Sequence, residues 1–289
     1  SSFDVIHIHS WWNLVVVPVA WICSLKKILP VISLRGTMTE FSVTHKNQGA
    51  KEWVHSLVGK KLLNRSFLDS TSIKEDQRLA AFIDNDRRYV IPNILEIPDT
   101  VRGIHEETPY FKLVYLGRID PAKNIELLLE ALNGTFPIPY QLTMVGEGEG
   151  SYAENLIAST KGNSRIKWIG NLDGEQKWNE LARADLLVLP SHIENYGNVV
   201  LESLSQGTPV LVSENVGSKD FVVNNKLGWV ANTNKEEWKL TLTDIWNQPD
   251  LRKDIRGRAP GIVKEEINKE RLLGLYEQMY RECIKANEA

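Results

Sequence analysis

Short apolar runs alternate with helical segments from Phe111 onward, and this alternation is the clearest pattern in the chain. Such an order is typical of βαβ units, whose strands form a parallel sheet. The pattern predicts strands at 112–116, 141–145, 165–169, 186–189, 210–212 and 229–230. Helices are expected between and after them, at 125–132, 152–159, 176–183, 199–205, 219–223 and 235–246. This region therefore predicts one complete doubly wound domain.

Upstream of Phe111 the pattern is less complete. Buried strands are expected at 4–9 and 30–34, a helix at 56–64 and the end of a further strand at 89–92. These elements make up only part of a second α/β domain. The segment 92–109 contains three prolines and scattered acidic residues, which is typical of a linker. At the far end, the spacing of apolar residues over 270–288 predicts a long amphipathic helix.

The most apolar stretch is 11–25, which contains Pro18 and ends at Lys26 and Lys27. It is shorter than the ~20 residues that a membrane-spanning helix needs. A helix in the core of the first domain is the favoured interpretation. The alternative is an interfacial helix that lies on anionic lipid.

Composition indicates how many domains the chain can form and which partners and compartment are favoured. A chain of 289 residues with 42% hydrophobic and 25% charged residues is long enough for two soluble domains. Its net charge of -3 and pI near 6.1 give no bulk attraction to nucleic acid. The cysteines, Cys23 and Cys283, have neither the spacing of metal ligands nor the density of a disulfide scaffold, which favours a reducing compartment such as the cytoplasm.

Candidate site residues follow the predicted strands of the second domain, at the carboxyl ends where open α/β sheets bind ligands. Gly117, Arg118 and Lys123 follow the first of these strands. An arginine fork and a lysine charge suit a diphosphate, both for binding it and for stabilising the charge that accumulates when it leaves. A solvated loop with incidental cations is the alternative.

The loops after the second and third strands are rich in glycine. Gly146, Glu147 and Gly148 form a segment that permits a close backbone approach or a positive φ. Gly170 and Leu172 offer backbone groups and an apolar side chain suited to the face and edge of a nucleobase. Plain turns explain both loops equally well, and the spacing of the glycines differs from the dinucleotide fingerprint.

Two glutamates eight residues apart follow the fourth strand. Glu194 lies in the loop, where it can bind hydroxyls of a sugar. Glu202 lies within the following helix, where it can accept the two vicinal hydroxyls of a ribose. The residues between them that open the helix are Tyr196, Gly197, Asn198 and Val199. A helix start of this kind favours a phosphate.

The first domain contributes fewer candidates. His7 and His9 lie on a buried strand, where a hydrogen-bonded core histidine is the common outcome, and His9 is the better candidate because it ends the strand. Arg35 and Gly36 follow the next strand in the same way. We expect His9, Arg35 and Gly36 to lie on the acceptor side of a cleft between the domains.

Together these segments resemble glycosyltransferase family 4, retaining enzymes with the two-lobe architecture called GT-B. The resemblance covers 111–246 and includes Gly117-Arg118 with Lys123, Gly146-Glu147-Gly148, Gly170, Glu194, Glu202 and Gly207-Thr208-Pro209-Val210. It implies that Arg118 and Lys123 contact the diphosphate of the donor. It also implies that Glu202 holds the ribose and that Glu194 binds the transferred sugar, with no metal or other cofactor.

The chain departs from the family pattern in its first lobe. The family often has a histidine before the glycine where Leu34-Arg35-Gly36 stands here, and that lobe usually opens with several further βα units. We therefore expect an α/β protein of GT-B architecture with a truncated N-terminal lobe and linker over 1–104. A complete donor-binding lobe is expected over 105–268, and a terminal helix over 269–289 that packs back on the first lobe.

The resemblance implies transfer of a sugar, with retention, from a nucleotide-diphosphate sugar to a glycan or lipid-linked acceptor. Assembly of surface polysaccharide or lipopolysaccharide is the expected setting. The expected location is the cytoplasm, with peripheral contact at the inner face of the membrane left open. Two alternatives are a truncated nucleotide-sugar-binding protein without turnover, and an epimerase or phosphorylase of the same two-lobe architecture.

Overall fold

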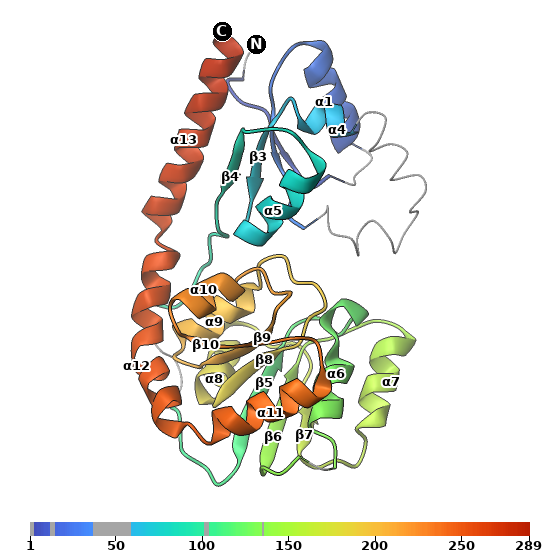
Figure 1. Ribbon diagram of the computed structural model, residues 1–289, viewed down its shortest axis with the longest axis vertical. Helices are drawn as coiled ribbons and strands as arrows, with labels where there is room; N and C mark the ends of the chain where they lie inside the picture. Colours follow the sequence, from blue (N-terminus) through green and yellow to red (C-terminus); the bar gives the residue numbers. More distant parts are fainter. Residues whose placement is uncertain (1–2, 12–14, 37–58, 101–103, 135) are drawn as a thin grey trace. The chain divides into compact units, whose positions relative to one another are not determined.

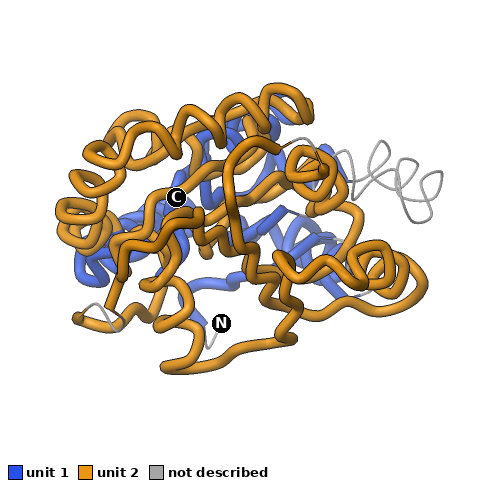
Figure 2. The backbone as a smooth tube through the Cα atoms, turned by 90° about the horizontal axis from the view of Figure 1, so that it is seen from below, with its two compact units in different colours: residues 1–94, 267–289 blue, residues 95–266 orange. Residues whose placement is uncertain are grey.

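A computed structural model describes residues 3–11, 15–36, 59–100, 104–134 and 136–289 (Figure 1). The chain forms two compact units: unit 1 consists of Ser1–Ile94 and Ile267–Ala289, and unit 2 of Leu95–Glu266 (Figure 2). Each unit is built around its own parallel sheet. Among the described residues, no helix combines the length and the apolar character that a membrane crossing requires.

Unit 1 contains a four-stranded parallel sheet whose strands pair in chain order. They are β1 (His7–His9), β2 (Val31–Ser33), β3 (Phe67–Ser70) and β4 (Arg88–Val90). The register sets His9 opposite Ser33 and Ser33 opposite Asp69. Because register partners point to the same side of a sheet, these polar side chains share one face.

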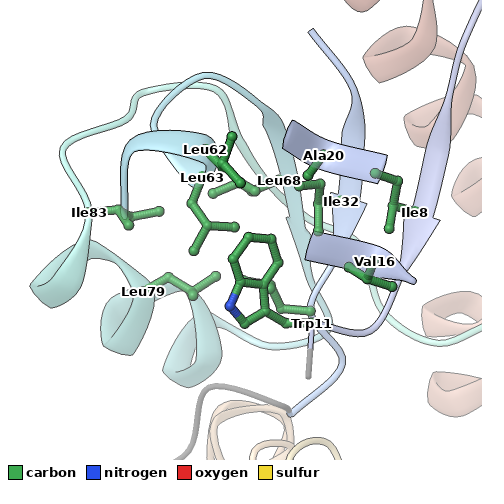
Figure 3. Packing of buried hydrophobic residues seen from close by; sticks show 11 residues of the cluster. Ile8, Trp11, Val16, Ala20, Ile32, Leu62, Leu63, Leu68, Leu79 and Ile83 are labelled. Atoms are coloured by element: carbon green, nitrogen blue, oxygen red, sulfur yellow. The ribbon is translucent and has the colours of Figure 1, made fainter. Parts of the chain in front are cut away.

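Helices cover both faces of this sheet. Three helices lie on one face, namely α1 (Val16–Leu25), α4 (Lys60–Leu63) and α5 (Ile73–Phe82). Their apolar side chains surround Trp11 and pack against Ile8, Ile32 and Leu68 of the strands (Figure 3). The last helix, α13 (Lys269–Glu288), covers the other face. Its buried residues Leu272, Met279 and Cys283 pack with Val31 and Phe67.

Unit 2 contains a six-stranded parallel sheet in the order β10-β9-β8-β5-β6-β7. The strands are β5 (Phe111–Leu116), β6 (Tyr140–Val145), β7 (Ile166–Trp168), β8 (Leu186–Leu189), β9 (Val210–Ser213) and β10 (Gly228–Ala231). The order reverses between β5 and β8, so their carboxyl ends form the switch point of a doubly wound sheet.

The helices of unit 2 pack in two groups. They are α6 (Ile125–Ala131), α7 (Ser151–Ser159), α8 (Gly174–Arg183), α9 (Asn198–Ser205), α10 (Lys219–Asn224), α11 (Lys235–Trp246) and α12 (Pro249–Glu266). Helix α6 packs beside α11, whereas α9 packs against α8 and α12. This grouping is typical of a sheet with helices on both faces.

The strands and helices predicted for unit 2 are confirmed with shifts of one or two residues at their ends, and α11 has the predicted bounds. Among the described residues, four elements were not predicted: β3, α5, α12 and the short 3-10 helix η2 (Pro121–Lys123). Strand β3 is short and contains the buried Asp69, and α12 contains Gly257, Pro260 and Gly261, which lower helix propensity.

In unit 1 the predicted helix 56–64 corresponds to α4, and residues 56–58 lie outside the described part of the chain. The favoured interpretation of 11–25 as a core helix is confirmed for one side of α1, where Val16, Ala20 and Cys23 are buried. Residues 12–14 of that stretch are not among the described residues.

Two adjacent leucines on α13 test how much this helix contributes to unit 1. Leu272 is fully buried in the apolar cluster, whereas Leu273 is 47% exposed. We expect Leu272→Ala to lower the free energy of unfolding of unit 1 by about 2 to 5 kcal/mol, because it opens a cavity. Leu273→Ala should change it by less than about 0.5 kcal/mol. Urea unfolding followed by circular dichroism measures both, and equal losses would contradict this packing of α13.

Candidate functional site

The switch point of unit 2 is built from the loops that follow β5 and β8. The first loop runs from Gly117 into a short 3-10 helix, η2 (Pro121–Lys123), and the second runs from Pro190 to Gly197. His192 N donates to Ala122 O at 2.9 Å. Asn124 Nδ2 donates to Pro190 O at 3.2 Å. The two loops are therefore held together by a backbone hydrogen bond and by the side chain of Asn124.

An ion pair connects the same two loops through their side chains. Lys123 Nζ donates to Glu194 Oε2, and the two side chains are only 12% and 19% exposed. Two predicted site residues, 71 positions apart in the chain, are thus brought together. Beneath them, the buried Tyr115 donates to Arg118 O at 2.7 Å. Burial, reinforced by the carboxylates of Asp120 and Glu194, raises the pKa of Tyr115, so its hydroxyl stays protonated.

Arg118 lies at the open side of this loop. Its side chain is 81% exposed, and its guanidinium is 3.3 Å from Asp120 Oδ2. The other oxygen of Asp120 accepts a hydrogen bond from Ala122 N at 3.0 Å and caps η2. An exposed arginine held only by a surface ion pair can reorient toward an anion at little cost.

The glycines after β5, β6 and β7 hold three loops in close contact. Gly117 N donates to Val145 O at 3.0 Å, and Gly146 N donates to Gly170 O at 2.8 Å. A Cβ on Gly146 would lie 1.9 Å from Gly117 O, and one on Gly148 would lie 2.1 Å from Ile119 O. These glycines are therefore required for loop-to-loop packing. Of the other candidates here, Glu147 is exposed and Leu172 is partly buried.

The start of α9 is fixed from the other side by the loop after β9. Gly197 caps the helix with a φ of 85°. Gly217 N donates to Glu194 O, and Ser218 N donates to Tyr196 O, both at 2.9 Å. Tyr196 is only 5% exposed and belongs to the core. The dipole of α9 places partial positive charge at this turn, next to the Lys123–Glu194 pair.

Glu202 forms a second ion pair at this end of the sheet, with a residue that the sequence analysis did not identify. Lys177 Nζ lies 3.1 Å from Glu202 Oε1, and the side chains are 22% and 18% exposed. The ammonium also lies 4.1 Å from the centroid of the Trp178 ring. Lys177 is in the first turn of α8, shortly after Leu172. Its place just after the loop of the third strand could have indicated that Lys177 belongs to the site. Its pairing with Glu202 could not be read from the sequence, because 25 residues separate the two.

The acceptor-side candidates lie in unit 1, and two of them are bound to neighbouring groups. Arg35 donates to Asn93 Oδ1 and, at 2.7 Å, to Tyr276 OH of α13. Gly36 N donates to Glu75 Oε1 at 2.6 Å. Arg35 thus joins the loop after β2 to the segment after β4 and to the terminal helix.

His9 borders a buried network on the same sheet face. The network is centred on Asp69, which accepts a hydrogen bond from Ser33 Oγ. The ring of His7 is hydrogen-bonded on both sides, through Nε2 to Ser33 Oγ at 2.7 Å and through Nδ1 to Tyr280 OH at 2.8 Å. The rings of His7 and His9 are 4.1 Å apart. Burial lowers the pKa of His9, and the nearby charges of His7 and Arg35 lower it further. His7 is therefore the hydrogen-bonded core histidine, and His9 is the exposed one.

The remaining question is how the acidic, histidine and cysteine side chains are distributed. Within the described ranges, no three His, Cys, Asp or Glu side chains gather closely enough to hold an ion. The charged groups at the switch point are arranged instead as two lysine–glutamate pairs. Such an arrangement offers both donors and acceptors to a ligand that carries phosphate and hydroxyl groups.

Comparison with known proteins identifies related sequences. A family model described as glycosyl transferases group 1 matches residues 99–261. The chain is 26% identical over 242 residues to a glycogen synthase of Mycobacterium tuberculosis, which covers 78% of this chain and 55% of that protein. It is 28% identical over 166 residues to the lipopolysaccharide core biosynthesis glycosyltransferase LpsE of Rhizobium meliloti, covering 57% of this chain and 48% of LpsE. The chain spans about half the length of these curated relatives.

A solved structure shows the same fold. HepE from Anabaena, crystallised with UDP and glucose, superposes with a TM-score of 0.76 at 17% identity, covering 96% of this chain and 77% of HepE. The predicted architecture of two Rossmann-like units with parallel sheets, GT-B, is confirmed.

Replacement of a loop glycine tests the packing at the switch point. We expect Gly146→Ala to destabilise unit 2 by about 2 kcal/mol or more, because the new Cβ meets Gly117 O and φ is 137°. Gly134→Ala is the control, since a Cβ there has nothing within 4 Å. Thermal unfolding compares the variants, and a Gly146→Ala protein as stable as the control would contradict the proposed loop packing.

Acidification tests the Asp69 network. Burial alone would raise the pKa of Asp69, but hydrogen bonds from His7 and Ser33 and the charge of Arg35 hold it below its ordinary value. A lowered pKa stabilises the fold above the unfolded value of about 3.9, and this stabilisation is lost as the pH falls through the folded pKa. The free energy of unfolding of the wild type should therefore fall between about pH 5 and pH 3 more steeply than that of Asp69→Asn.

Urea unfolding at a series of pH values measures this difference. Asp86→Asn, at an exposed carboxylate of the same unit, leaves the network intact and serves as the control. Parallel pH dependence in the wild type and Asp69→Asn would show that Asp69 does not contribute in this way.

Proposed function

Because the chain belongs to the glycosyl transferases group 1 family, we propose that it transfers a sugar from a nucleotide-diphosphate sugar to an acceptor. One observation carries this proposal. Two lysine–glutamate pairs, Lys123 with Glu194 and Lys177 with Glu202, lie at the carboxyl ends of the strands and flank the start of α9. A nucleotide-diphosphate sugar presents two groups of hydroxyls separated by two phosphates, and two carboxylates with cations near a helix start are groups that could bind them.

The diphosphate is assigned to the start of α9 with Lys123 and Arg118. Helix N-termini bind phosphate through their N–H groups and dipole. Lys123 lies in the adjacent loop, and the Arg118 side chain is 81% exposed, so that it can turn toward a phosphate. In this assignment both cations also stabilise the negative charge that develops on the leaving diphosphate, which accelerates transfer.

Glu202 is assigned to the ribose and Glu194 to the transferred sugar. Each carboxylate is paired with a lysine, and its oxygens can accept hydrogen bonds from hydroxyl groups. Entry of the donor would replace part of each ion pair with hydrogen bonds to the ligand. The resemblance to glycosyltransferase family 4 supports retention of configuration, with no metal in the reaction.

The acceptor is proposed to be a glycan or a lipid-linked saccharide in the assembly of a surface polysaccharide or lipopolysaccharide. The similarity to LpsE, a lipopolysaccharide core biosynthesis glycosyltransferase, supports this class. The glycogen synthase relative supports a glycan acceptor as well. The crystallisation of HepE with UDP and glucose makes UDP-glucose the first donor to test.

Calorimetry of ligand binding tests the donor site. Uridine, UDP and UDP-glucose should be titrated, with GDP and ADP as alternatives for the nucleoside. We expect Glu202→Ala to weaken the binding of uridine and of UDP alike, by about tenfold or more, because hydrogen bonds to a charged group are lost. Arg118→Ala and Lys123→Met should weaken the binding of UDP and leave the binding of uridine unchanged. Arg183→Ala, at an exposed arginine of α8, is the control.

Equal affinity in all variants would refute the residue assignments, and no nucleotide binding by the wild type would refute the donor site. Turnover requires a separate measurement of nucleoside diphosphate release with an acceptor present. Tight donor binding without release would favour a nucleotide-sugar-binding protein. Conversion of the donor sugar in the absence of acceptor would favour an epimerase.

A further inference from the structure

Helix α1 is apolar on its outer side as well as on its buried side. Pro18, Trp21, Ile22 and Leu25 are all exposed, and the last three are 52%, 47% and 65% exposed. Their spacing of i, i+3, i+4 and i+7 places them in one stripe along the helix. We call these four residues the α1 outer stripe. A helix that is apolar all round normally has both sides covered, so this stripe indicates a binding surface.

Exposed lysines lie on the segments next to the stripe. Lys26 and Lys27 follow the helix directly, and both are exposed. Helix α4 packs beside α1 and carries Lys60 and Lys61, which are exposed as well. The segments 5–35 and 59–68 contain no aspartate or glutamate. These two segments are therefore cationic, whereas the whole chain has a net charge of -3.

We propose that the α1 outer stripe, with Lys26, Lys27, Lys60 and Lys61, docks unit 1 on the surface of an anionic membrane. Apolar residues on one side of a helix with cations at its edge are the composition of interfacial helices, which lie in the plane of the membrane surface. Trp21 is of the residue type that favours the headgroup level, and the long lysine side chains reach anionic lipid while their stems contact apolar groups.

The charges favour lipid over a second copy of the chain. In a two-fold symmetric dimer through the stripe, the same four lysines of each copy would approach one another. Like charges brought together in this way oppose association. An anionic lipid surface instead attracts each lysine, strengthening binding by about fivefold per residue near the surface.

Vesicle sedimentation with the full chain tests the proposal. The probes are extruded vesicles of phosphatidylcholine alone and of phosphatidylcholine with phosphatidylglycerol. We expect the wild type to bind the anionic vesicles at least tenfold more tightly and to be released by salt. Leu25→Glu should weaken this binding at least tenfold. Leu240→Glu should not, although Leu240, on α11 of unit 2, is also 65% exposed.

Lysine variants separate the electrostatic contribution to vesicle binding from the contribution of the apolar stripe. The double variant Lys26→Ala with Lys27→Ala should weaken binding by about 25-fold. Lys161→Ala with Lys167→Ala, at exposed lysines of unit 2, should leave it unchanged. Circular dichroism confirms that each variant is folded.

Several results would overturn the proposal. They are absence of wild-type binding, equal binding to neutral and anionic vesicles, and equal losses in Leu25→Glu and Leu240→Glu. Sedimentation equilibrium adds a further one: self-association of the wild type that Leu25→Glu abolishes would assign the stripe to a second copy of the chain. The test does not depend on nucleotide binding, so it stands whether or not the proposed transfer is found.

Discussion

The pairing of Lys123 with Glu194 is the interaction on which the candidate site depends. It closes the switch point of unit 2, where the sheet order reverses and two loops part to opposite sides. Backbone hydrogen bonds hold the same loops, so the pair is formed on a rigid base. Both side chains are mostly closed to water, at 12% and 19% exposure. Groups preorganised in this way lose little entropy when a ligand replaces one of them.

Sequence patterns predicted most of the strands and helices of unit 2, and they grouped several candidate residues that the structure brings together. Apolar strands such as Leu186–Leu189 are buried on both faces and leave a plain signal. Glu194 and Lys123 could be placed at one sheet edge, because the carboxyl ends of parallel strands meet there. Their direct contact could not be predicted, since it depends on the path of two loops. Lys177 was missed for the same reason.

Unit 1 was harder to predict because its sheet face is partly polar. Ser33 and Asp69 interrupt the apolar runs of β2 and β3. They are tolerated because Ser33 is hydrogen-bonded to His7 and to Asp69, and Asp69 is ion-paired with Arg35, while tyrosines of α13 hydrogen-bond His7 and Arg35 in turn. Burial of a carboxylate is costly unless it is paired and hydrogen-bonded. The compensating groups come from distant parts of the chain, such as Tyr276 and Tyr280, and no local pattern connects them.

The discontinuous course of unit 1 sets an order for its folding during synthesis. All residues of unit 2 leave the ribosome before α13, which covers one face of the unit 1 sheet. Val31 and Phe67 therefore stay uncovered until α13 has been synthesised, after the whole of unit 2. Unit 2 can reach its native packing first although it comes second in the chain, and unit 1 is completed last. The apolar face left open in the meantime is where a nascent chain of this protein is most exposed to aggregation.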